Sequence, residues 1–249
     1  MAGPDKVAFI TGAAGAIGSA TARRLAQEGY ALALADTGPP ATGPDTPEAL
    51  VLTLDVRSGE QVRAAVARTL ETYGRIDVLV NVAGITSFGS ARELAETEWQ
   101  RVLDINLSGT FRCCQAVLPA MQAQGRGRIV NLGSVLGKNG GNARPWVDAA
   151  EQRGSGNVAY GVSKAGVHAM TAYLAREVAS LGITVNAVAP GPVASAMTTA
   201  LPPAIKSMIP VGRMGTPQDV AALIAFLASD AAGFITGETI DVNGGMWCD

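Results

Sequence analysis

Tyr160 and Lys164 are the side chains whose types and spacing most directly indicate chemistry. They stand four residues apart in a stretch predicted to be helical (158–181), so both lie on one helix face. A free tyrosine has a pKa of about 10 and is a poor base at neutral pH, but a neighbouring ammonium favours the phenolate. Such a pair could take a proton from an alcohol or give one to a carbonyl. Because this spacing occurs on many helices, the interpretation needs a cofactor site beside the pair.

A glycine-rich turn near the N-terminus could supply that site. The segment TGAAGAIG (11–18) joins a predicted strand to a predicted helix, and Gly12, Gly15 and Ala16 would let the backbone approach a pyrophosphate at the positive helix end. Asp36 ends the next predicted strand, 24 residues after Gly12. A carboxylate there accepts hydrogen bonds from an adenosine ribose and repels a 2′-phosphate, which favours NAD over NADP. Taken alone, the glycine spacing is also compatible with an ordinary turn.

The rest of the chain alternates short apolar runs with longer helical patterns. Strands are expected at 6–11, 31–36, 50–56, 76–84, 127–134, 182–190 and 238–245, and helices at 16–28, 59–73, 96–124, 158–181 and 217–229. Continuously apolar strands are typical of a parallel sheet that is buried on both faces. The alternation predicts a single α/β domain over 1–249, a Rossmann-type doubly wound parallel sheet of about seven strands with helices on both faces. Ligands of such sheets bind at the carboxyl ends of the strands.

Composition excludes several other classes of protein. The net charge of −2 gives no basic footprint for nucleic acid. The longest apolar run, 220–228, is far shorter than the roughly 20 residues of a membrane-spanning helix, and no secretory signal is visible. Three cysteines without a paired spacing indicate a reducing compartment, so a cytoplasmic location is expected. With one histidine and no paired cysteines, no metal site is expected.

These motifs occur in an order that resembles the short-chain dehydrogenase/reductase family over nearly the full length. The matching segments are TGAAGAIG, LDV (54–56), NVAG (81–84), DIN (104–106), Ser134, YGVSK (160–164), VNAVAPG (185–191) and the tail ITGETIDVNGG. Secondary alcohol dehydrogenases and 3-oxoacyl-carrier-protein reductases are the members it is most similar to. Two positions depart from the family pattern: Ala16 replaces a glycine and Val82 replaces an asparagine.

The resemblance implies roles for further residues. Ser134 would hydrogen-bond the substrate oxygen, Asn106 would hold a water that links Lys164 to solvent, and Lys164 would also hold the nicotinamide ribose. The expected cofactor contacts, from the pyrophosphate turn through the adenosine to the nicotinamide, are Ile17, Asp55, Val56, Asn81, Ala83, Gly84, Pro190, Gly191, Val193 and Ser195.

Two segments are candidates for the substrate side. Ser134 and Tyr160 are 26 residues apart, about twice the separation that the resemblance implies, so 137–157 is an inserted loop near the site. Its Arg144 and Trp146 favour a lid over a small polar or anionic substrate; the alternative is a surface loop with Arg144 paired to an acidic neighbour. By resemblance, the segment 192–214, which includes Met197, closes over the substrate; ordinary packing is the alternative. His168 is interpreted as a packing or subunit-interface residue, with a proton relay as the alternative. Cys113 and Cys114 are interpreted as packing residues, and Arg23 and Arg24 as solvated.

The sequence therefore predicts an NAD-dependent oxidoreductase that interconverts a secondary alcohol and a ketone. An NADPH-dependent 3-oxoacyl-thioester reductase is the close alternative. A non-catalytic NAD sensor and an S-adenosylmethionine-dependent methyltransferase remain from other classes, although neither needs the Ser134, Tyr160 and Lys164 set. The expected partners are a small-molecule substrate and further copies of the chain in a homotetramer, paired through 96–124 and 158–181.

Overall fold

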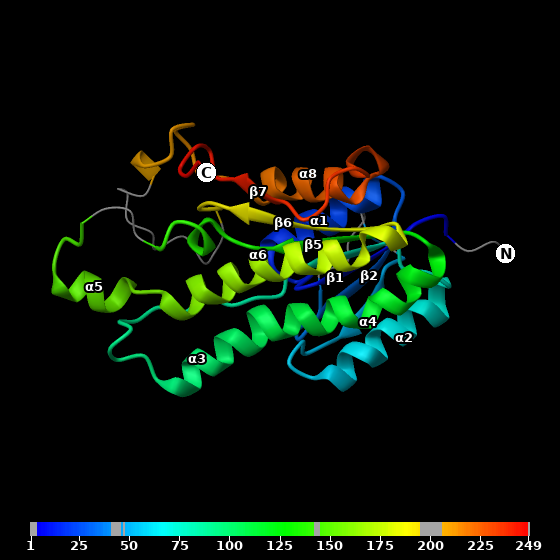
Figure 1. Ribbon diagram of the computed structural model, residues 1–249, viewed down its shortest axis with the longest axis horizontal. Coiled ribbons are helices and arrows are strands. Elements are labelled where there is room, and N and C mark those ends of the chain that lie inside the picture. Colours follow the sequence, from blue (N-terminus) through cyan, green and yellow to red (C-terminus); the bar gives the residue numbers. More distant parts are fainter. Residues whose placement is uncertain (1–3, 41–45, 47, 142–144, 195–205, 249) are drawn as a thin grey trace.

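Seven strands in the described part of the chain form one parallel sheet in the order β3-β2-β1-β4-β5-β6-β7 (Figure 1). The computed structural model describes residues 4–40, 46, 48–141, 145–194 and 206–248. The strands are β1 (Val7–Thr11), β2 (Ala31–Asp36), β3 (Leu50–Thr53), β4 (Val78–Asn81), β5 (Gly127–Leu132), β6 (Ile183–Pro190) and β7 (Thr239–Val242). The order reverses between β1 and β4, and their carboxyl ends leave a crevice for a ligand at that point.

Helices cover both faces of the sheet, as the apolar strands require. One face carries α1 (Ala16–Gln27) and α8 (Pro217–Ala228), and the other carries α2 (Gly59–Tyr73), α4 (Gly109–Gln124) and α6 (Val158–Val178), which Figure 1 shows in separate layers. Short helical turns follow α6, at η3 (Ala179–Leu181), and α8, at η5 (Asp230–Ala232). The predicted doubly wound α/β fold is confirmed. No helix among the described residues has the length and apolar character needed to cross a bilayer.

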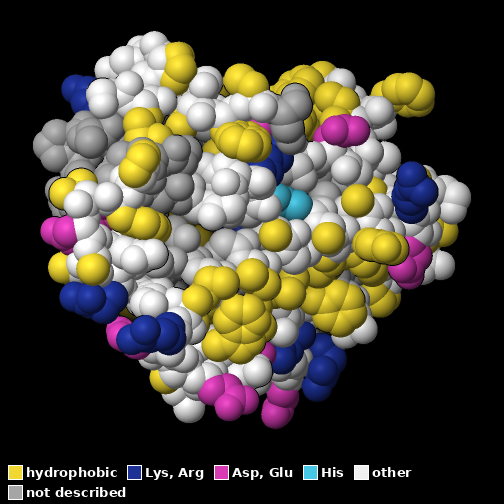
Figure 2. All heavy atoms as spheres, turned by 60° about the vertical axis from the view of Figure 1, so that its left-hand side comes forward, with side chains coloured by type: hydrophobic (Ala, Val, Ile, Leu, Met, Phe, Trp, Pro, Cys, Tyr) yellow, Lys and Arg dark blue, Asp and Glu magenta, His cyan; other side chains and the backbone are white. Residues whose placement is uncertain are grey.

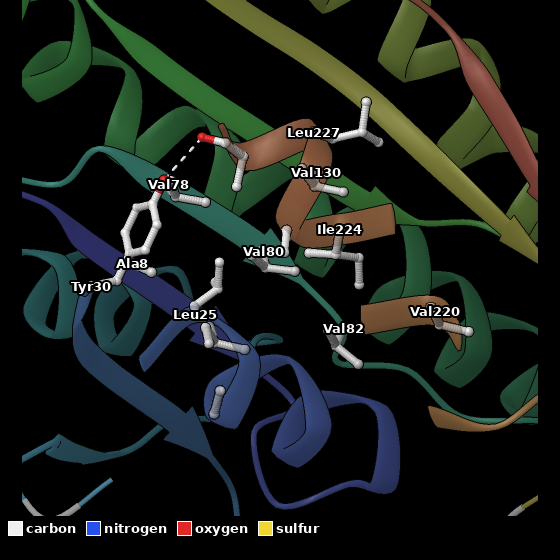
Figure 3. Close-up of a cluster of buried hydrophobic side chains, with 14 of the residues drawn as sticks. Ala8, Leu25, Tyr30, Val78, Val80, Val82, Val130, Val220, Ile224 and Leu227 are labelled. Atoms are coloured by element: carbon white, nitrogen blue, oxygen red, sulfur yellow. Dashed lines mark hydrogen bonds between the residues drawn. The ribbon is translucent and has the colours of Figure 1, made fainter. Parts of the chain in front are cut away.

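The core on the α1 and α8 side follows from the two-residue period of the strands. Ala8 on β1 and Val78 and Val80 on β4 point to this side and pack near Leu25 and Ile224 (Figure 3), while Phe9 points to the opposite face. Burying each large side chain contributes about 1.5–3 kcal/mol. The Tyr30 hydroxyl donates a hydrogen bond of 3.1 Å to the Ala228 carbonyl, which links the start of β2 to the end of α8.

The strands at the sheet edges differ from the sequence prediction. Residues of β3 alternate between half-buried and exposed, and all four residues of β7 are only half-buried, so neither strand is covered on both faces.

β4, a central strand, ends at Asn81, three residues before the end of the predicted strand at 84. The residues from Val82 onward instead form the loop that carries NVAG into the ligand crevice.

The predicted helix over 96–124 is interrupted. It consists of α3 (Glu96–Leu103), a π-helical turn η1 (Asp104–Ser108) and α4. The interruption places Asn106 inside the protein, where its side chain makes paired hydrogen bonds with the backbone of Ile85 (2.8 and 2.9 Å). π-turns inside helices concentrate at functional sites because they redirect one side chain.

The insertion is partly helical, which the sequence analysis did not predict. The turn η2 (Val135–Gly137) leads into it, and it contains a helix α5 (Ala149–Ser155), which lies at the far left of Figure 1. Asp148 caps α5 by accepting a hydrogen bond from the Glu151 N–H (2.7 Å), and the Glu151 carboxylate accepts one from the Val147 N–H (2.7 Å). An acidic pair at this spacing is a recognised helix start, so a signal for α5 was present.

Candidate active site

The glycine-rich turn forms an open cradle at the start of α1. Gly12 has a left-handed φ of +67°, and a β-carbon there would lie 2.5 Å from the Ala83 backbone nitrogen, so only glycine fits. Gly15 precedes α1 without a side-chain cap, which leaves the first N–H groups of the helix available to an anion. Ala16, one departure from the family pattern, is exposed and lines the same cavity as Gly12 and Gly15. The turn therefore fits a dinucleotide pyrophosphate.

Asp36 is held beside this turn at the carboxyl end of β2. Its carboxylate accepts hydrogen bonds from the Ala14 N–H (2.9 Å) and the Gly38 N–H (3.4 Å). The Thr37 hydroxyl donates a third, at 3.3 Å. Within the described residues Asp36 forms no ion pair with an arginine or lysine, so its negative charge is directed toward the cradle without a neutralising cation.

The next part of the crevice is lined by Asp55 and Val56, as predicted, and also by Arg57, which the sequence analysis missed. Arg57 contacts Asp55 through paired hydrogen bonds (2.9 and 2.6 Å), and this guanidinium holds the pKa of the Asp55 carboxyl below its usual range. Ala83 and Gly84 line the crevice as well, whereas Asn81 does not. The Asn81 side chain is buried and donates to Asn131 (2.9 Å), so it joins two strands beneath the site.

Tyr160, Lys164 and Ser134 meet at the other end of the crevice. Tyr160 and Lys164 come from successive turns of α6, and Ser134 follows β5. The Lys164 ammonium donates to the Leu132 carbonyl (2.6 Å) and lies 5.9 Å from the centre of the Tyr160 ring. Burial lowers the pKa of Lys164 to about 8. Burial also raises the pKa of Tyr160, and a hydrogen bond with the Ser134 side chain opposes that rise.

Asn106 lies behind this group rather than in the cavity wall. Its side chain bonds the Ile85 backbone and donates to the Ser163 hydroxyl (3.0 Å). A β-carbon on Gly84 would be 3.2 Å from Asn106 Oδ1 and 3.5 Å from Lys164 Nζ, so the missing side chain of Gly84 leaves both groups facing the same small space. The π-turn thus places Asn106 Oδ1 and Lys164 Nζ on the two sides of the space beside Gly84.

One cavity of about 970 Å³ joins these parts. It includes the predicted Gly12, Gly15, Ala16, Ile17, Asp36, Pro190, Gly191 and Val193 in its lining. Beyond Tyr160 its wall is mostly apolar and contains Trp146 from the insertion and Met208 from the predicted lid segment 192–214. It also contains residues that the sequence motifs did not identify: Ile85, Phe88, Leu136 and Met246. Figure 2 looks onto the side on which α5 lies, where hydrophobic side chains gather and charged ones lie mainly toward the edge. The predicted contacts Arg144, Ser195 and Met197 lie outside the described residues.

Comparison with known proteins identifies the family. A family model described as Enoyl-(Acyl carrier protein) reductase matches residues 12–247. The 3-oxoacyl-[acyl-carrier-protein] reductase FabG of Staphylococcus epidermidis is 40% identical over 98% of this chain and 99% of its own. FabG of Vibrio cholerae is 39% identical over 97% of each chain. The chain belongs to the short-chain dehydrogenase/reductase family. The solved structure of gox2181 is also similar, with 35% identity, a TM-score of 0.85 and coverage of 98% and 96% of the two chains.

Membership of the short-chain dehydrogenase/reductase family confirms the resemblance seen in the motifs and removes the methyltransferase alternative. It also establishes the coarse activity, that of an oxidoreductase acting on a small molecule with a nicotinamide cofactor. Most of the sequence motifs that match the family contribute residues to the cavity at the carboxyl ends of the strands. The insertion at 137–157 supplies part of the cavity wall in addition to them.

Proposed function

We propose that this protein is an NAD-dependent oxidoreductase that interconverts a secondary alcohol and a ketone, with Tyr160 as general acid and base. The observation that carries the proposal is the single cavity that has the Asp36 carboxylate at one end and Tyr160 with Lys164 at the other. A dinucleotide that spans these ends would bring its nicotinamide to the tyrosine. The bound nicotinamide would supply the site that accepts or donates the hydride.

The preference for NAD rests on Asp36. Its carboxylate is already fixed by three local hydrogen bonds and would accept further ones from the two ribose hydroxyls. A 2′-phosphate would place about two negative charges beside that carboxylate. In the described residues no cation contacts Asp36 to offset this repulsion. The relatives named FabG do not by their names test this preference.

The protein's own groups would handle the proton and position the substrate oxygen. In the oxidative direction Tyr160 Oη takes the alcohol proton, and in the reductive direction it returns one to the carbonyl oxygen. The Ser134 hydroxyl would hydrogen-bond that oxygen from the β5 side. The Lys164 ammonium would favour the phenolate when it lies beside the reacting tyrosine, and Asn106, across Gly84 from Lys164, would hold a water that relays the proton.

The insertion would select the substrate. Trp146, Glu151 and Ser155 line the cavity from the insertion, and Phe88 lines it from the loop after β4. The Gly89 N–H donates to the Gly156 carbonyl (2.6 Å), which joins these two segments through their backbones. The aromatic and methionine lining favours a less polar substrate than the sequence predicted. Met208, in the described part of the segment 192–214, would add to the cover, since it also lines the cavity.

The printed names of the relatives support the substrate class of a second candidate, a reductase of 3-oxoacyl thioesters, for which the sequence analysis gave NADPH as the cofactor. For the substrate class, these names favour the second candidate over the first, because several relatives at about 40% identity carry them. Asp36 and the joined insertion are the features that favour the first.

One assay separates the two candidates. The purified protein is given NAD or NADP with a panel of secondary alcohols, and NADH or NADPH with acetoacetyl thioester, while nicotinamide absorbance is followed. The first candidate predicts turnover of alcohols with NAD. Efficient reduction of the thioester with NADPH and no alcohol turnover would replace it with the second.

We further propose a homotetramer. The outward faces of α4 and α6 carry exposed apolar side chains, including Phe111 and Val162, and Leu107 and Met170 line a groove between them. Isolated apolar residues are normal on surfaces, but a contiguous apolar face favours burial against another copy. Light scattering at micromolar concentration tests this, and a monomeric mass would reject it.

A further inference from the structure

His168 is the one histidine of the chain, and its sequence context favoured a packing or subunit-interface residue. It lies on α6, one turn beyond Lys164. In the structure the backbone N–H of Ser134 donates a hydrogen bond of 3.3 Å to His168 Nε2. This bond joins residues 34 positions apart in the sequence, one of them the serine proposed to bind the substrate oxygen.

Two glycines make the space that the imidazole occupies. A β-carbon on Gly133 would overlap His168 Nε2, and one on Gly137 would lie 2.8 Å from His168 Cε1. The segment 133–137 therefore wraps around the ring at both ends of the serine turn. Gly133 is also anchored to β6, since its N–H donates to the Val188 carbonyl (2.8 Å). The ring and β6 together hold the backbone that leads into Ser134.

Three successive turns of α6 thus contact the end of β5. The Ser134 side chain opposes the rise in the pKa of Tyr160, Lys164 Nζ donates to the Leu132 carbonyl, and His168 accepts from the Ser134 N–H. The Ser134 hydroxyl is in addition an acceptor for the Leu136 N–H (3.2 Å). Ser134 is therefore constrained at its backbone by α6 and at its side chain by its own turn.

We propose that His168 is a positioning residue that sets the direction of the Ser134 hydroxyl through the serine backbone. An imidazole that accepts at Nε2 carries its proton on Nδ1, so the contact selects one neutral tautomer. An aliphatic side chain at this position would leave the Ser134 N–H without its acceptor, and misplacement of a substrate-binding group by about 1 Å can reduce turnover roughly a hundredfold. The proposal rests on the role assigned to Ser134 under the proposed function.

The kinetic test compares His168→Leu, which removes the acceptor, with His168→Gln, whose amide oxygen reaches a similar position. Arg176→Leu, at an exposed position two turns further along α6, is the control for a helix substitution. We expect His168→Leu to lower kcat between about ten- and a hundredfold with the KM for the dinucleotide unchanged. His168→Gln should recover most of that loss. If both variants have the kcat of the wild type, the proposal is overturned. It is also overturned if both variants lose the same amount of kcat and at the same time have a lower melting temperature and a higher KM for the dinucleotide.

A second measurement does not depend on the reaction. Because the chain has one histidine, the ¹⁵N spectrum of histidine-labelled, tag-free protein reports His168 alone. At pH 8, above the ordinary imidazole pKa of about 6.5, we expect the Nδ1–H tautomer. The Nε2–H tautomer would overturn the contact itself. The expected tautomer together with a fully active Ser134→Ala variant would instead refute the proposed role of Ser134, which distinguishes the two failures.

Discussion

The charge of Asp36 gives the most direct test of cofactor preference. The substitution Asp36→Asn removes that charge but keeps an amide oxygen to accept from the Ala14 N–H, which now bonds the carboxylate at 2.9 Å. The turn and the cradle at Gly12 should therefore persist. Any change in the ratio of NAD to NADP efficiency then reports the charge rather than a rearranged turn.

The size of the effect follows from the surroundings of Asp36, which is half-buried and open to the crevice. A carboxylate and a phosphate of about two charges, about 5 Å apart in a water-like dielectric, repel by about 2 kcal/mol. Losing the charge on the acceptor of a ribose hydroxyl weakens NAD binding by about 1 kcal/mol more. We expect the NAD to NADP ratio of kcat/KM to exceed about ten in the wild type and to fall roughly a hundredfold in Asp36→Asn.

The assay is initial-rate kinetics with both dinucleotides at low and high salt. Screening should reduce the NAD preference of the wild type as ionic strength rises, because the repulsion acts through solvent. Glu60→Gln makes the same change of charge at an exposed position on the first turn of α2 and serves as the matched control. A ratio in Asp36→Asn within twofold of the wild type, or a wild type that uses NADP as well as NAD, would refute the reasoning.

Three further predictions concern the catalytic end and the insertion. Tyr160→Phe should lower turnover at least about a hundredfold while NADH binding, measured by fluorescence, is kept; near-normal turnover would contradict the proton role. Lys164, whose pKa burial lowers to about 8, binds fewer protons in the folded than in the unfolded chain between about pH 8 and 10, so its own contribution to stability rises with pH there. Burial raises the pKa of Cys113 and Cys114, and these thiols act in the opposite direction over the same range, so the contribution of Lys164 is read from a comparison with Lys164→Met. In urea unfolding of the cofactor-free proteins, the stability of the wild type relative to Lys164→Met should rise by about 2 kcal/mol by pH 9.5, and a difference that does not change with pH would disprove it. Replacing 139–155 by a short glycine turn should raise the KM for the substrate far more than the KM for NAD. If both KM values and the oligomeric state are unchanged, the insertion has no role in substrate binding.

The strands, the doubly wound order and the family could be predicted because their signals are local. Each apolar run is short and bounded, and the turn at Gly12 requires a left-handed backbone that only glycine adopts readily. Tyr160 and Lys164 could be paired from helical spacing alone, and the structure places both in the cavity wall.

Other features depend on contacts that no local pattern encodes. The π-turn follows from the bonds between Asn106 and the backbone of Ile85, which come from distant segments. Ile85 and Phe88 line the cavity from the loop after β4, whose path is not encoded by a local pattern. Arg57 carries no motif, and its place depends on the pairing with Asp55. The contact of His168 with Ser134 required knowing which side of α6 faces β5.

The backbone bond between Gly89 and Gly156 has a consequence for how this enzyme could acquire new substrates. The bond closes the insertion without using a side chain, and none of the residues of α5 is buried. Sequence changes within 149–155 would therefore leave both the hydrophobic core and the closure of the loop intact, while still altering the wall that contains Glu151 and Ser155. If the insertion selects the substrate as proposed, randomising α5 alone would give a library in which the core is unchanged and specificity varies.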